Sequence, residues 1–225
     1  MALLLAIETA TRNCSVGLFQ DQEILQIKEY VSDKYSHSEQ LTLFIQEVLK
    51  NANITFKELD GIALSKGPGS YTGLRIGTST AKGLCYSLNI PLVSISTLRA
   101  MAFGISDKES YKLYCPMIDA RRMEVFAAIY DYDNQVVREI QANIVDKQTF
   151  SAFLQDKMLF FGDGASKCKN IINNDNAHFL DDIFPSAKDM CLLVYQKFIN
   201  KDFEDIAYFE PYYLKDFVAG GENKI

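Results

Sequence analysis

The sequence is predicted to fold as an α/β protein with two domains, each a mixed sheet with helices packed on it. Apolar strand-like runs and helical segments alternate through the first hundred residues, and strand-like runs start again near Tyr114. Between these parts, glycine and short polar residues interrupt the pattern over residues 103–110. A chain of 225 residues is long enough to bury two small cores. We therefore expect domains of residues 1–103 and 104–225.

Three strand-like segments open the chain. Residues 3–7 are apolar, and residues 15–19 and 24–31 are rich in branched and aromatic side chains. The polar residues 20–23 form the turn between the second and third segments. No basic residue precedes the first apolar run, and acidic Glu8 ends it, so we interpret it as a buried strand and not as a signal peptide.

The next segments alternate helix and strand. A helix is expected over residues 36–51, because apolar side chains recur there at the i, i+3, i+4, i+7, i+8 spacing of one helical face. Ser36 begins an S-x-x-E capping box at its start. Strands at residues 61–65 and 92–95 flank a second helix of small residues at 72–88. This order is similar to the ribonuclease H-like half-unit of the actin/sugar-kinase/Hsp70 (ASKHA) superfamily.

The second half is expected to be a more divergent copy of the same architecture. Residues 117–120 and 124–130 flank a short turn and are typical of a hairpin, and residues 136–145 could form a third strand. Residues 158–161 predict a further strand, and residues 190–198 have the apolar spacing of a helix.

Composition and charge argue against several classes of function. The formal net charge is −6; residues 1–100 balance at 9 Lys+Arg and 9 Asp+Glu, while residues 101–225 hold 14 and 20. No concentrated basic patch is visible, so we expect any RNA role to depend on a partner. The five cysteines are dispersed without a C-x-x-C pair, which favours reduced thiols in the cytoplasm. No apolar run reaches the roughly 20 residues that span a bilayer.

A glycine-rich loop is the most informative segment. Residues 66–77 read KGPGSYTGLRIG, between a predicted strand and a predicted helix. Glycine suits positive φ or close approach of another backbone, and the start of a helix offers free N–H groups. Gly73, Gly77 and Ala81 then leave one helical face nearly bare. That face could pack on the protein's own sheet or on a partner, and the residues alone do not separate these alternatives.

Two further segments could be remnants of nucleotide-binding loops. Glu8, Thr9 and Thr11 follow the first strand, where this superfamily places a phosphate loop, and Gly162 and Gly164 lie where it places adenosine-binding glycines. Ordinary turns, with hydroxyl groups bonded to their own backbone, are the favoured interpretation of both segments. The glycine-rich loop is not a P-loop, because its lysine precedes the glycines.

Independent catalysis is not expected from this sequence. The only histidines, His37 and His178, are far apart, so no H-x-x-x-H pair could place two metal ligands on one helical face. No G-x-S-x-G nucleophile motif is present either. We therefore predict no catalytic residue and no metal site in this chain.

The glycine-rich loop resembles the G-P-G-S-[FY]-T-G-[LV]-R-[IV]-G segment of the TsaB (YeaZ) family. Residues 5–18 are similar to that family's opening strand and hairpin, with Glu8 and Ala10 as variants of its D/E-T-S-T segment. Three further blocks resemble its H-S-E-x-L, D-A-R-R-x-E-V and P-x-Y-L motifs, at residues 37–41, 118–126 and 211–215. The similarity extends over nearly the whole chain and is strongest before residue 130.

The resemblance implies a non-catalytic subunit in bacterial tRNA threonylcarbamoyladenosine synthesis. A TsaD-like subunit would transfer threonylcarbamoyl to N6 of adenosine-37 in tRNAs that read ANN codons, and a TsaE-like ATPase would join the complex. The chain would contact tRNA only through the complex, would form a homodimer when isolated, and would hold no cofactor of its own; any ATP or ADP would be bound in the assembled complex. The implied partner-interface residues, on the two N-terminal helices, are His37, Glu39, Leu41, Phe44, Ile45, Tyr71, Thr72, Gly73, Arg75, Gly77, Ser79 and Lys82.

Two alternatives remain open at this point. The chain could be an independent ATPase or kinase, or a glycoprotease-like metalloprotease, of the same superfamily, as the two candidate nucleotide loops would suggest. It could also be a homodimeric interaction protein outside RNA biology. Tight binding of ATP or metal by the isolated chain would favour the first alternative, and normal tRNA modification after its depletion would favour the second.

Overall fold

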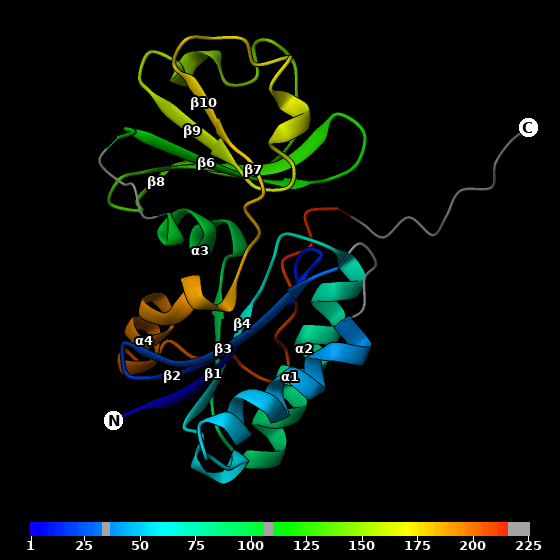
Figure 1. Ribbon diagram of the computed structural model, residues 1–225, viewed down its shortest axis with the longest axis vertical. Coiled ribbons are helices and arrows are strands. Elements are labelled where there is room, and N and C mark those ends of the chain that lie inside the picture. The colour runs from blue at the N-terminus through cyan, green and yellow to red at the C-terminus, as the bar shows by residue number, and fades with distance from the viewer. Residues whose placement is uncertain (33–36, 106–109, 216–225) are drawn as a thin grey trace, which may run out of the picture.

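Two five-stranded sheets organise the protein. The computed structural model describes residues 1–32, 37–105 and 110–215. In Figure 1 the first sheet lies in the lower part of the molecule and the second sheet in the upper part. The strands of the first sheet, in the order β3-β2-β1-β4-β5, are β1 (Leu3–Glu8), β2 (Asn13–Gln20), β3 (Glu23–Val31), β4 (Gly61–Ser65) and β5 (Leu92–Ile95).

The second sheet repeats the topology of the first. Its strands, in the order β10-β9-β6-β7-β8, are β6 (Leu113–Asp119), β7 (Glu124–Asp131), β8 (Val136–Ile144), β9 (Met158–Phe161) and β10 (Ala177–Leu180). In each sheet the first three strands are antiparallel neighbours, and the last two run parallel to the first. This order confirms the predicted fold class of two ribonuclease H-like units.

Helices cover both faces of the first sheet. On one face lie α1 (His37–Asn51) and α2 (Tyr71–Leu88), side by side in Figure 1, and on the other lie α3 (Thr97–Gly104) and α4 (Cys191–Ile199). Strand β1 shows why both faces are covered. Leu5 and Ile7 pack in the core with α1 and α2, whereas Leu4 and Ala6 pack in the core with α4, as expected where side chains alternate across a strand.

Helix α3 connects the two sheets. Ala100 belongs to the core of the first sheet, whereas Leu98 and Met101 pack with Tyr114 and Ile118 of the second sheet. Within the described residues, the connections between strands of the second sheet hold only short 3-10 turns, η2 (Ser151–Phe153) and η3 (Ser166–Cys168). Two further turns, η1 (Phe56–Glu58) and η4 (Ala187–Met190), precede β4 and α4.

The predicted division of the chain requires a correction. The predicted second domain, residues 104–225, contains η4 and α4, yet Met190 and Val194 are buried in the core of the first sheet. Phe209 packs in the core beneath α1 and α2. The chain thus returns to the first sheet after β10, because the face of that sheet opposite α1 and α2 needs an apolar cover. Residues 106–109 of the predicted boundary, and the predicted cap Ser36, lie outside the described residues.

A C-terminal strap, residues 204–215, links the two sheets. Glu204 bridges to Leu92 at the edge of the first sheet. Lys82 Nζ donates to the carbonyl oxygens of Ala207 and Phe209 at 3.3 and 3.1 Å. The strap then reaches the second sheet, where Leu214 packs against its core and Lys215 forms an ion pair with Glu124.

Candidate functional site: a buried joint and an exposed helix pair

The sequence motifs converge on one buried joint. We use the name hairpin joint for the turn between β1 and β2, residues 9–12, together with the glycine-rich loop and His37. Thr9 Oγ1 donates to Gly73 O at 2.8 Å, and the N–H of Ser70 donates to Ala10 O at 2.7 Å. His37 Nε2 donates to Thr11 O at 2.7 Å, which ties the start of α1 to the same turn. Three motifs that are distant in sequence therefore hold one another in place.

Close backbone contact explains the glycines of this joint. A Cβ added to Gly69 would clash with Ala10 O, and one added to Gly73 would clash with Thr9 O. At Gly77 it would clash with Thr9 Oγ1. These glycines, with buried Ala81, face the protein's own hairpin and sheet. The prediction that Gly73 and Gly77 form a partner interface is therefore wrong, and the bare face of α2 is internal packing.

The apolar stripe of α1 is also internal. Leu41, Phe44 and Ile45 were expected at a partner interface, but they lie in the core between α1 and the first sheet, with at most 8% of their surface exposed. His37 is 2% exposed and bonded within the hairpin joint, and burial lowers its pKa. These four predicted contacts are corrected, because an amphipathic helix places its apolar stripe against its own sheet.

Other predicted interface residues border the strap. The Arg75 guanidinium lies 4.3 Å from the centre of the Tyr71 ring, and that ring lies 4.9 Å from the ring of Tyr213. Lys82 holds strap carbonyl groups, as described above. The remaining three predicted residues, Glu39, Thr72 and Ser79, are exposed and lie outside the bonds described for the joint and the strap. Their contact with a partner remains a prediction.

The outward side of α1 and α2 forms a second candidate surface, which we name the helix-pair face. Its exposed residues are Ser38, Glu39, Thr42, Leu43, Gln46, Thr72, Arg75, Ser79, Gly83 and Tyr86. Leu43 is 59% exposed and Tyr86 85% exposed. Beyond Arg75, the exposed side of α2 carries no charged residue, which is typical of the centre of an interface.

Gly83 is the residue on this face that the fold does not explain. A Cβ placed on Gly83 would meet no atom within 4 Å, in contrast to Gly73 and Gly77. Glycine in a helix interior costs about 0.5–1 kcal/mol relative to alanine. The sequence interpretation missed this position, although Ser79 and Gly83, spaced four residues apart, form a small-residue pair separate from the Gly73 stripe.

The first candidate nucleotide loop is closed by its own bonds. Glu8, Thr9 and Thr11 are at most 1% exposed. Thr11 Oγ1 accepts from the N–H of Asn13 at 3.4 Å, and Glu8 Oε1 accepts from the N–H of Ala10 at 2.6 Å. Burial raises the pKa of Glu8 to about 7. The hydroxyl groups therefore satisfy backbone groups, as the favoured interpretation of a polar turn expects.

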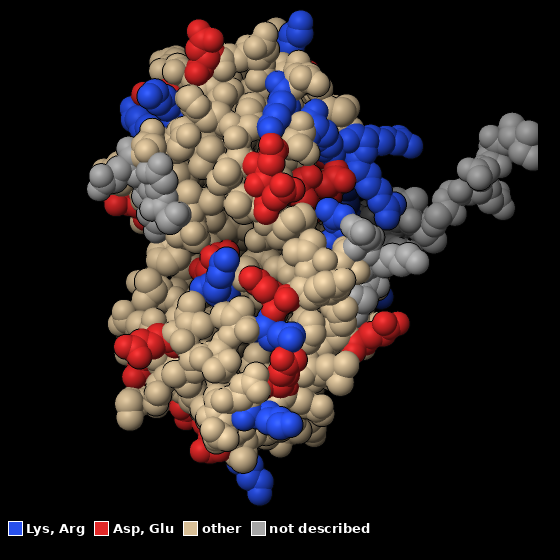
Figure 2. Space-filling model, in the orientation of Figure 1, with Lys and Arg blue, Asp and Glu red and all other residues tan. Residues whose placement is uncertain are grey.

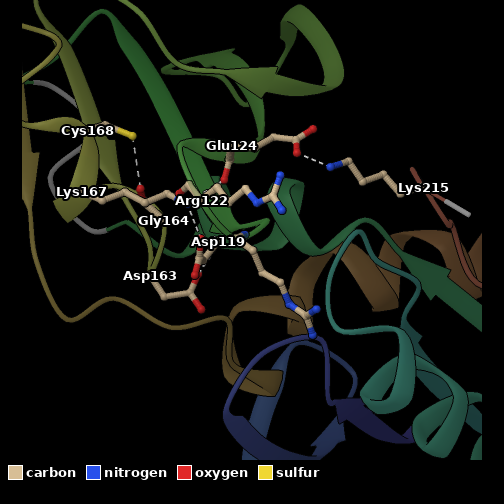
Figure 3. Close-up of polar contacts among 9 residues, drawn as sticks. Asp119, Arg122, Glu124, Asp163, Gly164, Lys167, Cys168 and Lys215 are labelled. Carbon is tan, nitrogen blue, oxygen red and sulfur yellow. Dashed lines mark hydrogen bonds and ion pairs between the residues drawn. The ribbon is translucent and has the colours of Figure 1, made fainter. Parts of the chain in front are cut away.

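The second candidate loop packs against β6. A Cβ on Gly162, which has φ 107°, would clash with Met117 O, and one on Gly164 would lie 2.9 Å from Ile118 C. Asp163 Oδ1 accepts from the N–H of Asp119 at 3.0 Å (Figure 3). These contacts give Gly162 and Gly164 a structural role in this turn.

The described residues hold neither a metal-binding cluster nor a membrane-spanning helix. Within residues 1–32, 37–105 and 110–215, no group of three or more His, Cys, Asp and Glu side chains could hold a metal ion. His178 lies beside the ring of Tyr111, far along the chain from buried His37. In the part of the chain that the structure describes, no helix is both long and apolar enough to cross a membrane.

Comparison with known proteins places the chain among related sequences. A family model described as TsaD, tRNA N6-adenosine threonylcarbamoyltransferase, matches residues 31–221. The tRNA threonylcarbamoyladenosine biosynthesis protein TsaB of Escherichia coli K12 is 28% identical, with 96% of each chain covered. TsaB of Bacillus subtilis is 31% identical over 76% of this chain and 75% of the relative. TsaB of Buchnera aphidicola subsp. Schizaphis graminum is 32% identical over 84% of this chain and 90% of the relative.

Solved structures show the same fold. A solved structure of YeaZ from Pseudomonas aeruginosa is 23% identical and matches with a TM-score of 0.79, over 95% of this chain and 100% of that one. A second structure from the same organism, of an uncharacterized protein similar to peptidase YEAZ, matches with a TM-score of 0.81 at 22% identity. That match spans 96% of this chain and all of the other.

Proposed function

The chain belongs to the TsaB (YeaZ) family, and on that premise we propose that it is the non-catalytic partner subunit of a TsaD-like threonylcarbamoyltransferase. The partner would modify N6 of adenosine-37 in ANN-decoding tRNAs, in the cytoplasm. The hairpin joint supports the non-catalytic role, since Thr9, Thr11 and His37 are engaged in bonds that hold the fold together. Their side chains serve the structure of this subunit, and the chemistry is left to the partner.

One observation carries the docking proposal. Gly83 lowers the stability of α2 at an exposed position, although a Cβ there would meet no atom of the protein itself. A partner that packs closely there would explain the missing side chain. Tyr86 and Leu43 supply exposed apolar area beside it, and tyrosine is enriched in protein interfaces. We therefore place the catalytic partner on the helix-pair face.

The same face would serve the other assemblies of the family. In isolation two copies of this chain would pair through it, and the catalytic subunit would displace one copy. A TsaE-like ATPase would join the heterodimer, and any ATP or ADP would be held by the assembled complex. tRNA would bind to the complex and not to the isolated chain, whose formal net charge is −6.

Gly83→Leu tests the docking site. The leucine side chain has room in the isolated protein but would obstruct a closely packed partner, so affinity for the cognate catalytic subunit should fall by about 30-fold or more, as for the loss of an interface hot spot. Calorimetry with the purified subunits measures it. Gln196→Leu, at an exposed position of α4 on the opposite face of the first sheet, is the matched control and should bind normally.

Other outcomes of this experiment would point elsewhere. Undiminished binding by Gly83→Leu would remove the helix-pair face from the interface. If the isolated chain bound ATP or a metal ion tightly and stoichiometrically, an independent enzyme of the same superfamily would be favoured. Normal threonylcarbamoyladenosine levels in tRNA after depletion of the chain, measured by nucleoside mass spectrometry, would favour a role outside RNA modification.

A further inference from the structure

The tip of the hairpin between β6 and β7 has an unusual backbone. Arg121 and Arg122 are consecutive and both left-handed, with φ of 70° and 50°. Residues with a side chain avoid this region, and turns that need it normally use glycine, asparagine or aspartate. Two arginines in succession therefore occupy positions where turn geometry alone would select other residues. Such outliers cluster at functional sites.

The two guanidinium groups are exposed and uncompensated. Among the described residues, neither side chain makes a hydrogen bond or an ion pair, whereas the lysines beside them are paired. Lys167 forms an ion pair with Asp119, and Lys215 forms one with Glu124. The two carboxylates that flank the tip in the sequence, Asp119 and Glu124, are thus each paired with a lysine. Figure 2 shows Lys and Arg close to Asp and Glu on the right of the upper part of the molecule.

The hairpin is held firmly behind the arginines. Lys167 Nζ donates to Arg122 O at 2.8 Å and to Glu124 O at 2.7 Å, as Figure 3 shows for the labelled residues. The N–H of Arg121 donates to Asp119 Oδ1 at 3.0 Å. On the other side, the N–H of Val145 donates to Met123 O at 2.8 Å. These bonds hold the backbone of the tip in place. The two arginine side chains take no part in them and can therefore contact an external ligand.

The tip is connected to the helix-pair face through the strap. Lys215 pairs with Glu124 at the base of the hairpin, and Tyr213, two residues earlier, lies against Tyr71 in the first turn of α2. If a partner docked on the helix-pair face binds a large ligand, that ligand would therefore lie near the arginine tip.

We propose that Arg121 and Arg122 contact the phosphodiester backbone of the tRNA bound by the assembled complex. The planar guanidinium fork matches phosphate oxygens, and a convex, exposed tip suits a long polyanion. This inference rests on the proposed function, which supplies the RNA. The competing ligand is a surface of a protein partner that carries carboxylates. RNA binding and assembly in the absence of RNA distinguish these two ligands.

The test measures RNA binding by the complex as a function of salt. Arg121→Gln/Arg122→Gln, assembled with the cognate catalytic subunit, would be titrated with an unmodified transcript of an ANN-decoding tRNA. Each lost phosphate contact should weaken binding by about 4–5-fold near physiological salt and reduce the log–log salt slope by about 0.7–0.9. Lys57→Gln/Lys201→Gln removes the same charge from exposed positions outside the second sheet and should change neither value.

Charge-conserving variants distinguish binding from a structural role. Arg121→Lys/Arg122→Lys should retain most of the salt slope, because a lysine still neutralises a phosphate. An unchanged affinity and slope in the glutamine variant, relative to the lysine control pair, would overturn the proposal. Weaker assembly with the catalytic subunit in the absence of RNA would also overturn it, in favour of a protein contact. Failure of the unmodified chain to form the complex would instead contradict the proposed function.

Discussion

At the residue scale, Glu8 is the most unusual group in the protein. Its carboxyl group is completely buried at the end of β1. Burial raises its pKa to about 7, and the negative charge of Asp189 adds to the rise, while hydrogen bonds from Ser65 and Ala10 oppose it. Oε2 has no hydrogen-bond partner among the described residues, so it is the oxygen that can hold the proton. Folding therefore favours the neutral carboxyl.

This burial predicts a pH-dependent stability. Between an unfolded pKa near 4.5 and a folded pKa near 7, the folded state binds the Glu8 proton more tightly, so the free energy of unfolding should fall as pH rises through that window. The contribution is at most roughly 3–4 kcal/mol, from about 1.4 kcal/mol for each of the roughly 2.5 units between the two pKa values. Denaturant unfolding of Glu8→Gln at pH 5 and pH 8 measures it, because glutamine does not titrate.

Asp189 titrates in the same window and must be controlled. Burial raises its pKa to about 7 as well, so the unmodified protein should lose stability through both groups. Asp189→Asn should retain the Glu8 part of the pH dependence. If Glu8→Gln leaves the difference in stability between pH 5 and pH 8 unchanged, Glu8 is ionised in the folded protein and this account of the site is wrong.

At the element scale, α2 carries small residues on two faces with different causes. Gly73 and Gly77 face the hairpin joint, whereas Gly83 faces solvent. The sequence predicted the helix and its bare stripe correctly. It could not assign the stripe to the interior or to a partner, because both environments select small residues. Only the position of the hairpin in three dimensions resolves this.

The same substitution on the two faces should have opposite effects. Gly83→Ala should stabilise the isolated protein by about 0.5–1 kcal/mol, because its Cβ meets open space and alanine favours helix. Gly73→Ala should destabilise it by about 1–3 kcal/mol, since its Cβ would clash with Thr9 O. Denaturant unfolding gives both values. Equal changes in the two variants would contradict the assignment of faces.

The elements that the sequence did not predict, α3 and β10, are short. The strands and longer helices were predicted because alternation and helical periodicity act within each segment. Helix α3 has only eight residues, and apolar side chains surround it because it packs between two sheets. Such a segment has no polar face to reveal its period. Strand β10 reads AHFL and is only partly buried, so it lacks the strongly apolar run by which the equally short β5 and β9 were predicted.

At the scale of the whole molecule, the strap determines how the two sheets are joined. Phe209 fills the core beneath α1 and α2, while Leu214 packs against the second sheet. No local pattern in the sequence predicts these contacts, because the partners of Phe209 in α1 and α2 lie more than a hundred residues away and those of Leu214 lie dozens of residues away. For this reason the sequence analysis divided the chain into two contiguous halves. For the same reason it did not predict that the strap would contact residues at the border of the helix-pair face.

The strap should hold through its apolar contacts and not through its ion pair. Phe209→Ala should lower the free energy of unfolding by about 3 kcal/mol, because it empties a buried position. Lys215→Ala should cost less than about 1 kcal/mol, since the Lys215 side chain is exposed in its pair with Glu124. Urea unfolding of both variants compares them. A larger loss in Lys215→Ala would contradict this view of the strap.

The central claim is that this chain supplies a docking face and its partner supplies the chemistry. The most direct measurement is threonylcarbamoyl transfer to an ANN-decoding tRNA by the cognate catalytic subunit, with the ATPase subunit present. Transfer should require the unmodified chain, persist with Gln196→Leu and fall sharply with Gly83→Leu. Full transfer without this chain, or full transfer with Gly83→Leu at limiting concentration, would contradict the claim.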